Sequence, residues 1–435
     1  MQAADYFNGS SFVPGEMAEA LIEDNALKLA YRNGTVDGCI MEYDGGVWKP
    51  AHNLDVQIQD KLGKCCRDYH VQQTLSFLKR RLYADGKEWE EWNPRRRLIN
   101  CRNDMLDPET GELMQHEPSY LSLFQLPVEW NPDVECSVVD NFLQDVVRKE
   151  DVPVLKQMMG YLLVPVLKAD KFFVLEGKSG TGKTTFWEAF LEVIGSSNYA
   201  QVSLQDITSS RFGASDLENK LVGTYDDLRM DSLQEAGELK KLTGGFPYMR
   251  IERKYEQAYE APLFARFLFT CNRMPEAPDK SEAWYRRLCL IPFPNQFYGT
   301  EAEDPEFADK LQTPEAKQRL FYLAVEGLQN LMANDWRFPV TDSTKALMRK
   351  YRLRNDSLGA FVEDHCNFEP ETAIRRSECY DQYEAYCDNH GASKMQYKEF
   401  KERMAQEYDC TSERKRIDGE LARWFIGVDL ETSPV

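Results

Sequence analysis

One eight-residue segment restricts the fold of this chain more than any other feature of its sequence. Residues 177–184 read Gly-Lys-Ser-Gly-Thr-Gly-Lys-Thr, which fits the phosphate-binding pattern G-x4-G-K-[ST] at every position. Residues 172–175 before it are apolar and strand-like, and residues 186–194 after it have the spacing of an amphipathic helix. A strand, a glycine loop and a helix in this order predict a nucleotide-binding α/β unit.

The residue types in this loop match the chemistry of a triphosphate. Glycines let backbone N–H groups close around phosphates, and the helix that begins near Lys183 directs the positive end of its dipole at them. We expect Lys183 to contact the β and γ phosphates and Thr184 to offer its hydroxyl to Mg²⁺. The flanking strand and helix argue against a glycine-rich turn without a ligand. The predicted ATP-binding residues are Gly177, Lys178, Ser179, Gly180, Thr181, Gly182, Lys183 and Thr184.

A pair of carboxylates follows the next predicted strand. Residues 221–225 are less apolar than a usual buried strand, because Gly223 and Thr224 interrupt them, and Asp226 and Asp227 come directly after. Hydrolysis at a phosphate-binding loop needs a carboxylate on a neighbouring strand to hold Mg²⁺ and orient the attacking water. The sequence leaves open which aspartate does which, and the alternative is a surface Asp-Asp turn.

Two more strand boundaries carry candidate catalytic residues. The apolar residues 267–271 end at Asn272, which we expect between the two earlier strand ends, where it can sense the γ-phosphate or position water. The alternative is a capping asparagine. Arg286 and Arg287 precede the apolar residues 288–293 and are candidates for an arginine that reaches the nucleotide of a neighbouring subunit, which requires an oligomer. A solvated or salt-bridged pair is the alternative.

The bulk composition limits how this chain can bind other molecules. The formal net charge is −19 over 435 residues, which excludes a protein that coats nucleic acid with its whole surface. DNA binding then requires basic residues gathered in one channel or one small domain. Residues 158–167 form the longest apolar run, which is too short for a bilayer, and no secretory signal is visible, so we expect a cytoplasmic protein without a membrane partner. The eleven cysteines lack any C-x2-C pair, which favours scattered reduced thiols.

The order of the predicted elements favours an α/β fold with a mostly parallel sheet. We expect helices at residues 18–31 and 71–82 and a hairpin turn at residues 107–112, and we interpret the basic residues 349–354 as a solvated helix face. The chain divides into five predicted parts, which are a mixed helical region (1–95), a pre-motor α+β region and candidate oligomerisation collar (96–165), the P-loop core (166–300), a helical extension and linker (301–356), and a winged-helix-like domain (357–435).

The last part of the chain contains the cluster of basic residues that DNA binding requires in a chain with a negative net charge. Predicted helices at residues 377–389 and 394–406, followed by two strands around Asp418 and Gly419, fit a winged-helix pattern. Such a unit can place one helix in a groove and its wing on the backbone. Acidic residues interleave with the basic ones, so a solvated helix face is the alternative. The candidate DNA-binding residues here are Lys394, Lys398, Arg414, Lys415 and Arg416.

Taken together, these motifs resemble those of superfamily 3 helicases, and more closely the helicase portion of phage and plasmid primase-helicases, the group that includes the poxvirus primase-helicases. The resemblance covers most of residues 40–430, and residues 100–132 and 159–163 match the region that precedes the motor. The matching motifs are residues 177–184, Asp226-Asp227, residues 243–255, residues 272–275, Arg286-Arg287-Leu288 and residues 291–293.

The resemblance implies an AAA+-like core that assembles into a ring, usually a homo-hexamer, which moves along one DNA strand from three-prime to five-prime. It favours Arg287 over Arg286 as the arginine that acts in trans. It also implies a DNA-gripping hairpin, with Arg253, Lys254 and Tyr255 at or beside its tip, where a lysine contacts phosphate and an aromatic ring packs on sugar or base. An exposed amphipathic strand is the alternative. The chain departs from the family at Phe246, where an aspartate is common.

Fuller members of this family carry an N-terminal primase domain. The N-terminal region here, residues 1–95, has no Asp-x-Asp pair with a downstream histidine, so we expect no primase activity in this chain and a separate primase or polymerase as a partner. The leading hypothesis is an ATP- and Mg²⁺-dependent helicase that acts on single-stranded or forked DNA in replication of a phage or mobile element, in the host cytoplasm. One alternative is an initiator or loader that melts origin DNA locally, and another is an ATPase that DNA only activates, for instance in antiviral defence.

Overall fold

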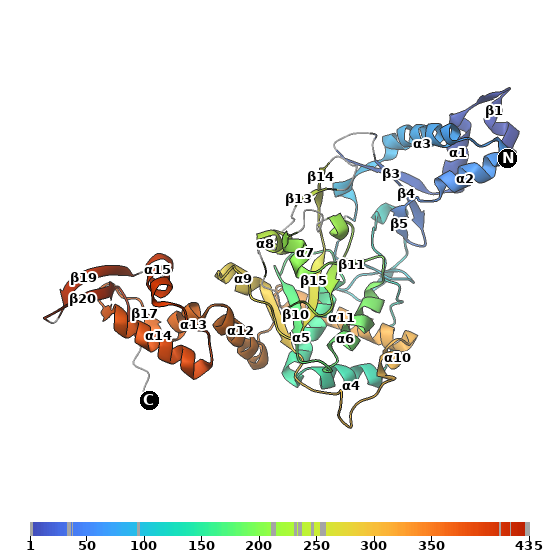
Figure 1. Ribbon diagram of the computed structural model, residues 1–435. Helices are drawn as coiled ribbons and strands as arrows, with labels where there is room; N and C mark the ends of the chain where they lie inside the picture. Colours follow the sequence, from blue (N-terminus) through green and yellow to red (C-terminus); the bar gives the residue numbers. More distant parts are fainter. Residues whose placement is uncertain are drawn as a thin grey trace.

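The structure is a computed structural model that describes residues 3–32, 36, 38–93, 96–209, 215–229, 233, 237–244, 248–252, 258–408, 410–417 and 419–430. The molecule consists of an N-terminal part, a central α/β part and a C-terminal part arranged in a row, with the two chain ends at opposite ends of the row (Figure 1). Among the described helices, none combines the length and the apolar character that crossing a membrane requires.

A five-stranded parallel sheet forms the centre of the molecule, which confirms the predicted parallel α/β core. The strands lie in the order β11-β12-β15-β10-β16, so β15 separates the strand before the glycine loop from the strand before the two aspartates. Their bounds are β10 (Phe172–Glu176), β11 (Tyr199–Gln201), β12 (Val222–Tyr225), β15 (Arg266–Cys271) and β16 (Leu288–Pro292).

Alternate residues of the central strands face two different hydrophobic cores, as the two-residue period of a strand requires. In β10, Phe173 and Leu175 face one core and Phe172 and Val174 face the other. The first core is covered by α4 (Ser137–Val146), α5 (Val152–Leu162), α6 (Lys183–Ile194), α10 (Phe307–Leu311) and α11 (Pro314–Ala333). The second is covered by α7 (Leu204–Ser209), α8 (Gly237–Thr243), α9 (Glu282–Arg287) and α12 (Asp342–Asn355).

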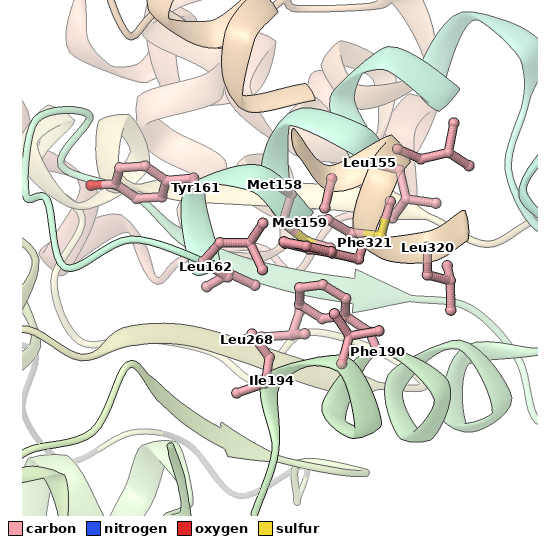
Figure 2. Packing of buried hydrophobic residues seen from close by; sticks show 14 of the residues in the cluster. Leu155, Met158, Met159, Tyr161, Leu162, Phe190, Ile194, Leu268, Leu320 and Phe321 are labelled. Carbon is pink, nitrogen blue, oxygen red and sulfur yellow. The ribbon is translucent and has the colours of Figure 1, made fainter. Parts of the chain in front are cut away.

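Helices α5 and α11 cross at unusually close range on the first face of the sheet, above β15 and α6 (Figure 2). A Cβ on Gly160 would lie 2.3 Å from the carbonyl oxygen of Ala324, and one on Gly327 would lie 2.0 Å from that of Lys156. Only glycine at both positions permits this backbone contact. Segments before and after the glycine loop therefore share one core with the sheet, and the predicted five-part division of the chain stays a prediction.

The N-terminal part differs from the expectation in one element. The prediction of a helix at residues 18–31 is wrong for the second half of that range. Helix α1 (Pro14–Asp24) ends at Asp24, and Leu27–Tyr31 forms strand β3. The backbone becomes extended at Asn25, and β3 then pairs antiparallel with β4 (Cys39–Asp44), where tertiary pairing outweighs local helix propensity. The sheet order is β5-β4-β3-β6.

Two other expectations for the residues before the central sheet agree with the structure. The helix expected at residues 71–82 lies within α3. The turn expected at residues 107–112 joins β8 to β9, and the amide of Asp107 donates to the carbonyl of Glu112 at 2.9 Å. The other helices and strands before the central part are β1 (Phe7–Asn8), β2 (Ser11–Phe12), β5 (Val47–Pro50), α2 (Leu54–Leu62), α3 (Asp68–Leu82), β6 (Lys87–Glu88), β7 (Ile99–Asn100), β8 (Met105–Leu106) and β9 (Leu113–Met114).

The C-terminal part confirms both predicted helices and the predicted strand pair, and its described residues add helix α13 and the short strands β17, β18 and β21, which the sequence pattern did not reveal. The short strand β18 pairs with β20 and completes a sheet of order β18-β20-β19. The elements are α13 (Ser357–His365), β17 (Cys366–Asn367), β18 (Ala373–Arg375), α14 (Arg376–His390), α15 (Tyr397–Glu407), β19 (Thr411–Ile417), β20 (Glu420–Ile426) and β21 (Asp429–Leu430).

Helix α12 joins the central sheet to the C-terminal part, and its basic stretch is not simply a solvated face. Arg352 donates to Glu282 of α9 at 2.7 Å and to Glu363 of α13 at 3.1 Å. Its guanidinium also lies 4.4 Å from the ring centre of Tyr285. The interpretation of residues 349–354 as a solvated face is therefore wrong at Arg352, because acidic and aromatic groups distant in sequence surround it.

Candidate nucleotide-binding site

The glycine loop leaves the carboxyl end of β10 and turns directly into α6. Gly180 and Gly182 have φ values of +79° and +81°, a region that glycine adopts without strain. Gly182 stands at the N-cap of α6, and a Cβ there would lie 2.9 Å from Cγ1 of Val146. Both conformation and space thus require glycine, and the loop presents the amino end of a twelve-residue helix to the site.

Lys183 lies inside the loop that precedes it. Its Nζ donates to the carbonyl oxygens of Gly177 at 2.7 Å and Lys178 at 2.8 Å, and the residue is only 7% exposed. Burial lowers the pKa of the Lys183 ammonium, and the nearby Cys271, Asp226 and Asp227 side chains oppose that shift. The positive charge is therefore held within the loop, close to two carboxylates.

The two aspartates after β12 face different partners. Asp226 accepts a hydrogen bond from the Thr184 hydroxyl at 3.0 Å, and Thr270 donates to the same carboxylate. Asp227 adopts a φ of +52°, its amide donates to the Thr270 hydroxyl at 2.8 Å, and its carboxylate accepts from Asn272 at 3.3 Å. The left-handed turn at Asp227 thus aims one carboxylate at the loop and the other at the end of β15.

The sequence analysis missed two residues of this site, Thr185 and Thr270, of which Thr270 contacts the aspartates. Thr270 is the penultimate residue of β15, is 1% exposed, and contacts both aspartates through its hydroxyl. The signal was a hydroxyl residue within an otherwise apolar strand core. The predicted position of Asn272 is confirmed, because β15 lies between β10 and β12 and brings this amide between the two other strand ends.

These side chains line one cavity of about 250 Å³ at the carboxyl edge of the sheet. Its walls combine glycine-loop residues with the ends of β12 and β15. The Thr184 hydroxyl and the Asp226 carboxylate are the oxygen ligands that Mg²⁺ prefers, and Mg²⁺ usually takes its remaining ligands from water and phosphate. The residues present therefore fit the expected ion. The lining residues are Ser179, Gly180, Thr181, Gly182, Lys183, Thr184, Thr185, Asp226, Asp227, Thr270 and Asn272.

The arginine pair lies at the opposite edge of the sheet. Arg287 precedes Leu288, which pairs with Phe172 at the start of β10, whereas the loop follows the end of that strand. The five residues of β10 therefore separate Arg287 from the glycine loop, which corresponds to roughly 16 Å along the strand. Arg287 is half-buried and donates to the carbonyl of Ala283 at 2.9 Å, and Arg286 is exposed. The fold does not bring either arginine to the nucleotide site of its own chain.

The expected DNA-binding residues fall into two groups. Arg253, Lys254 and Tyr255 lie outside the described residues. The segments on either side of them, β13 (Tyr248–Ile251) and β14 (Tyr259–Pro262), pair antiparallel, which agrees with the predicted hairpin.

In the C-terminal part, Lys394 pairs with Asp388 at 2.8 Å and Lys398 is exposed on α15. Arg414, Lys415 and Arg416 are all exposed on β19. The fold thus leaves one continuous basic strand on the surface of this part.

Three family models match this chain. Residues 15–148 match the family described as D5 N terminal like, and residues 353–415 match the one described as Poxvirus D5 protein-like. Residues 175–287, which contain the candidate nucleotide site, match a family of unknown function, DUF5906.

One curated relative is a protein of Acanthamoeba polyphaga mimivirus named "Putative helicase L207/L206". It is 26% identical over 135 residues, which is 29% of this chain and 14% of the relative. The match therefore spans only a small part of that protein. The predicted resemblance to poxvirus primase-helicase-like proteins is confirmed by this relative and by the two D5-type family models.

Solved structures share the fold of nearly the whole chain. The apo structure of the NrS-1 C-terminal region (305–718) superposes with a TM-score of 0.55 at 13% identity, over 96% of this chain and 99% of the other. The A form of the same apo region gives a TM-score of 0.55 over 95% of this chain and 99% of the other. At such low identity the likeness extends to the fold alone.

Proposed function

We propose, from this D5-type relationship, that the chain is an ATP-dependent, ring-forming DNA helicase that serves replication of a phage or mobile element in the host cytoplasm. The observation that carries the proposal is the meeting of three separate strand ends in one cavity. Lys183, Asp226 and Asn272 are far apart in the sequence and converge at the carboxyl edge of a parallel sheet. A phosphate-binding loop, a carboxylate and a polar sensor are the groups that nucleotide hydrolysis requires.

The contacts favour separate roles for the two aspartates. Asp226 shares a hydrogen bond with Thr184, so we assign these two residues to the Mg²⁺ site, where the bound ion neutralises charge on the β and γ phosphates. Asp227 contacts Asn272, so we assign this pair to the attacking water, with Asp227 accepting its proton and Asn272 orienting it. Thr270 donates to the Asp226 carboxylate and accepts from the backbone amide of Asp227, so it positions both residues.

The position of the arginine pair supports an oligomer. Because Arg287 lies at the amino edge of the sheet, its side chain serves a nucleotide only if a second copy presents its carboxyl edge there. An arginine supplied in trans stabilises the charge that develops on the transferred phosphoryl group. We therefore propose a ring, with a hexamer as the expected size, in which each site is completed by its neighbour.

Two surfaces are proposed to hold DNA. The β13–β14 hairpin leads to Lys254, whose ammonium we assign to the strand in the centre of the ring. The C-terminal part combines α14 and α15 with a sheet of order β18-β20-β19, an arrangement that supports the winged-helix interpretation. Strand β19, with its exposed Arg414, Lys415 and Arg416, forms the proposed wing. Exposed cations on an extended hairpin suit contacts with the phosphate backbone.

The test compares hydrolysis and strand separation in the same preparation. We expect ATPase activity that single-stranded DNA stimulates, together with unwinding of a forked substrate, and we expect both to disappear in Lys183→Ala. Lys87→Ala, which removes a lysine from an exposed ion pair with Glu91, is the matched control.

Each other outcome has a definite meaning. Melting of blunt origin duplex with little fork unwinding would replace the helicase with an initiator or loader. DNA-stimulated hydrolysis without strand separation would leave an ATPase that DNA activates. A wild-type chain that does not hydrolyse ATP would refute the proposal.

A further inference from the structure

A second cavity adjoins the glycine loop on the side away from the aspartates. It measures about 320 Å³ and shares Gly180, Gly182 and Thr185 with the phosphate cavity. The phosphate cavity ends at Asp226, Asp227 and Asn272, whereas the second cavity extends toward α4 and the segment after β16. An elongated ligand can therefore place one end in each cavity while its middle lies over the loop.

Aromatic side chains dominate the second cavity, which we call the aromatic cavity. Its rings come from Phe142 of α4, Phe297, Tyr298 and Phe307. Phe142 is 5% exposed and its ring centre lies 5.1 Å from that of Phe307, so these two form a fixed wall. Tyr298 is 70% exposed, although its neighbours on both sides are held to the protein. An exposed tyrosine beside a phosphate loop offers a free face for a flat ligand.

The chain fixes this tyrosine to the loop through the backbone. The carbonyl oxygen of Gly180 accepts hydrogen bonds from the amides of Phe297 at 2.9 Å and Tyr298 at 3.2 Å. The side-chain amide of Gln296 donates to the carbonyl of Ser179 at 3.0 Å. The aromatic wall and the phosphate loop are thus one rigid unit, which is the arrangement that binding two ends of one ligand needs.

The charged groups of the two cavities differ. The phosphate cavity contains the Lys183 ammonium and the amino end of α6, beside the carboxylates of Asp226 and Asp227. The described lining of the aromatic cavity contains no lysine or arginine, and it does contain the carboxylates of Asp145, Glu303 and Asp304, the last of which is paired with Lys310 at 2.6 Å. These carboxylates repel a triphosphate and accept hydrogen bonds from N–H groups. The aromatic cavity therefore suits an uncharged, flat group that carries N–H donors.

We propose that the aromatic cavity binds the purine base of the nucleoside triphosphate whose phosphates the loop holds, with Tyr298 stacking on the base. The inference rests on the proposed ATPase function and adds base recognition to it. A purine presents two fused rings to the tyrosine and exocyclic amino groups to the carboxylate rim. A pyrimidine covers less of the aromatic wall, so the site discriminates between the two classes of base by stacking area.

The test separates the base from the phosphates by using two probes on the full chain in the presence of Mg²⁺. Calorimetric titration measures the affinity for ATPγS, which hydrolyses slowly, and for inorganic tripolyphosphate, which has no base. Tyr298→Ala should weaken ATPγS binding by roughly 5- to 150-fold, the range for loss of one base–aromatic stack, and leave tripolyphosphate binding unchanged. Tyr298→Phe should keep the wild-type affinity for both probes.

Competition with CTP supplies a second readout. The wild-type chain should bind ATP more tightly than CTP, and Tyr298→Ala should reduce this difference. Tyr69→Ala, at another exposed tyrosine in the N-terminal part, is the matched control, and thermal unfolding midpoints confirm that the variants fold.

The possible failures are distinguishable. Equal affinity of the wild type for ATPγS and tripolyphosphate, or an unchanged ATPγS affinity in Tyr298→Ala, would overturn the base site and leave the phosphate site intact. An equal loss of both probes in Tyr298→Ala would also overturn it, because the tyrosine would then act on the loop. Failure of the wild type to bind either probe would overturn the proposed ATPase and the base site together.

Discussion

The nucleotide site and the C-terminal part both contain charged residues that the sequence presents as clusters, and the fold uses the two sets differently. In the nucleotide site, Lys183, Asp226 and Asn272 meet although nearly ninety positions of sequence, 183 to 272, separate the first from the last. They meet because parallel strands deliver their carboxyl ends to one edge of the sheet. The position of the backbone at these strand ends therefore brings the three side chains together.

In the C-terminal part, neighbours in sequence separate into different roles. Arg403 is 12% exposed at its side chain and binds Asp356 at 2.9 Å and Glu407 at 2.6 Å, so it joins α15 to the start of α13. Lys394 pairs with Asp388 at the surface, and β19 keeps its cations exposed. In this part, the acidic partners of each basic side chain determine its role. A count of basic residues does not reveal which of them are available to DNA.

The largest expected effect belongs to the nucleotide site. Lys183→Ala removes the only charge that the loop itself holds inside the phosphate cavity, and we expect ATP hydrolysis to fall by about 100- to 1000-fold, as for loss of a key transition-state donor. The far-ultraviolet circular dichroism spectrum should not change, because Lys183 is the first residue of α6 and its ammonium contacts loop carbonyls, not a hydrophobic core. Hydrolysis within tenfold of the wild-type rate would contradict this expectation, because the position of Lys183 inside the glycine loop would then not be needed for hydrolysis.

A smaller effect, on stability, belongs to the buried charge pair of the C-terminal part. Arg403→Ala leaves the Asp356 carboxylate, 8% exposed, without its partner, and we expect the free energy of unfolding of this part to fall by about 3 kcal/mol. Hydrogen exchange of α15 and β20 amides measures the change. Lys394→Ala, which breaks an exposed pair, is the control and should change the free energy by less than about 1 kcal/mol. An equal loss of unfolding free energy in the two variants would contradict the expectation that the buried pair contributes more than the exposed pair.

The smallest effect belongs to the exposed cations of β19. Replacing Arg414, Lys415 and Arg416 by alanine should weaken DNA binding by about tenfold and reduce the slope of affinity against salt concentration by about 0.7 to 0.9 per lost phosphate contact. Fluorescence anisotropy at several salt concentrations measures both. The triple replacement of Lys79, Arg80 and Arg81 on α3 removes the same charge from the N-terminal part. If that control weakens binding equally, β19 is no specific DNA surface.

The sequence predicted the central sheet and most of the residues that line the candidate nucleotide site, because both depend on local patterns. The glycine loop needs particular backbone conformations, and a buried strand needs an apolar run, so both leave a direct record in the residue types. The order β11-β12-β15-β10-β16 then places Asn272 where the sequence analysis expected it.

The remaining features depend on tertiary partners, which leave a weaker record. Thr270 looks like an ordinary strand residue until both aspartates are seen to contact it. Residues 27–31 form too short a run to outweigh the preceding helix pattern, and pairing with β4 decides their conformation. Arg352 reads as a surface charge because its acidic partners, Glu282 and Glu363, lie on other helices.

The most direct test of the account is complementation between two inactive variants. Lys183→Ala loses its own phosphate site and keeps its arginine, whereas Arg287→Ala keeps the phosphate site and loses the arginine that a neighbour needs. Each variant alone should hydrolyse little ATP, and mixing them should restore part of the wild-type rate, because a mixed ring contains sites with an intact loop and an intact neighbouring arginine. No recovery on mixing, together with full hydrolysis by a monomeric wild-type chain, would contradict the account.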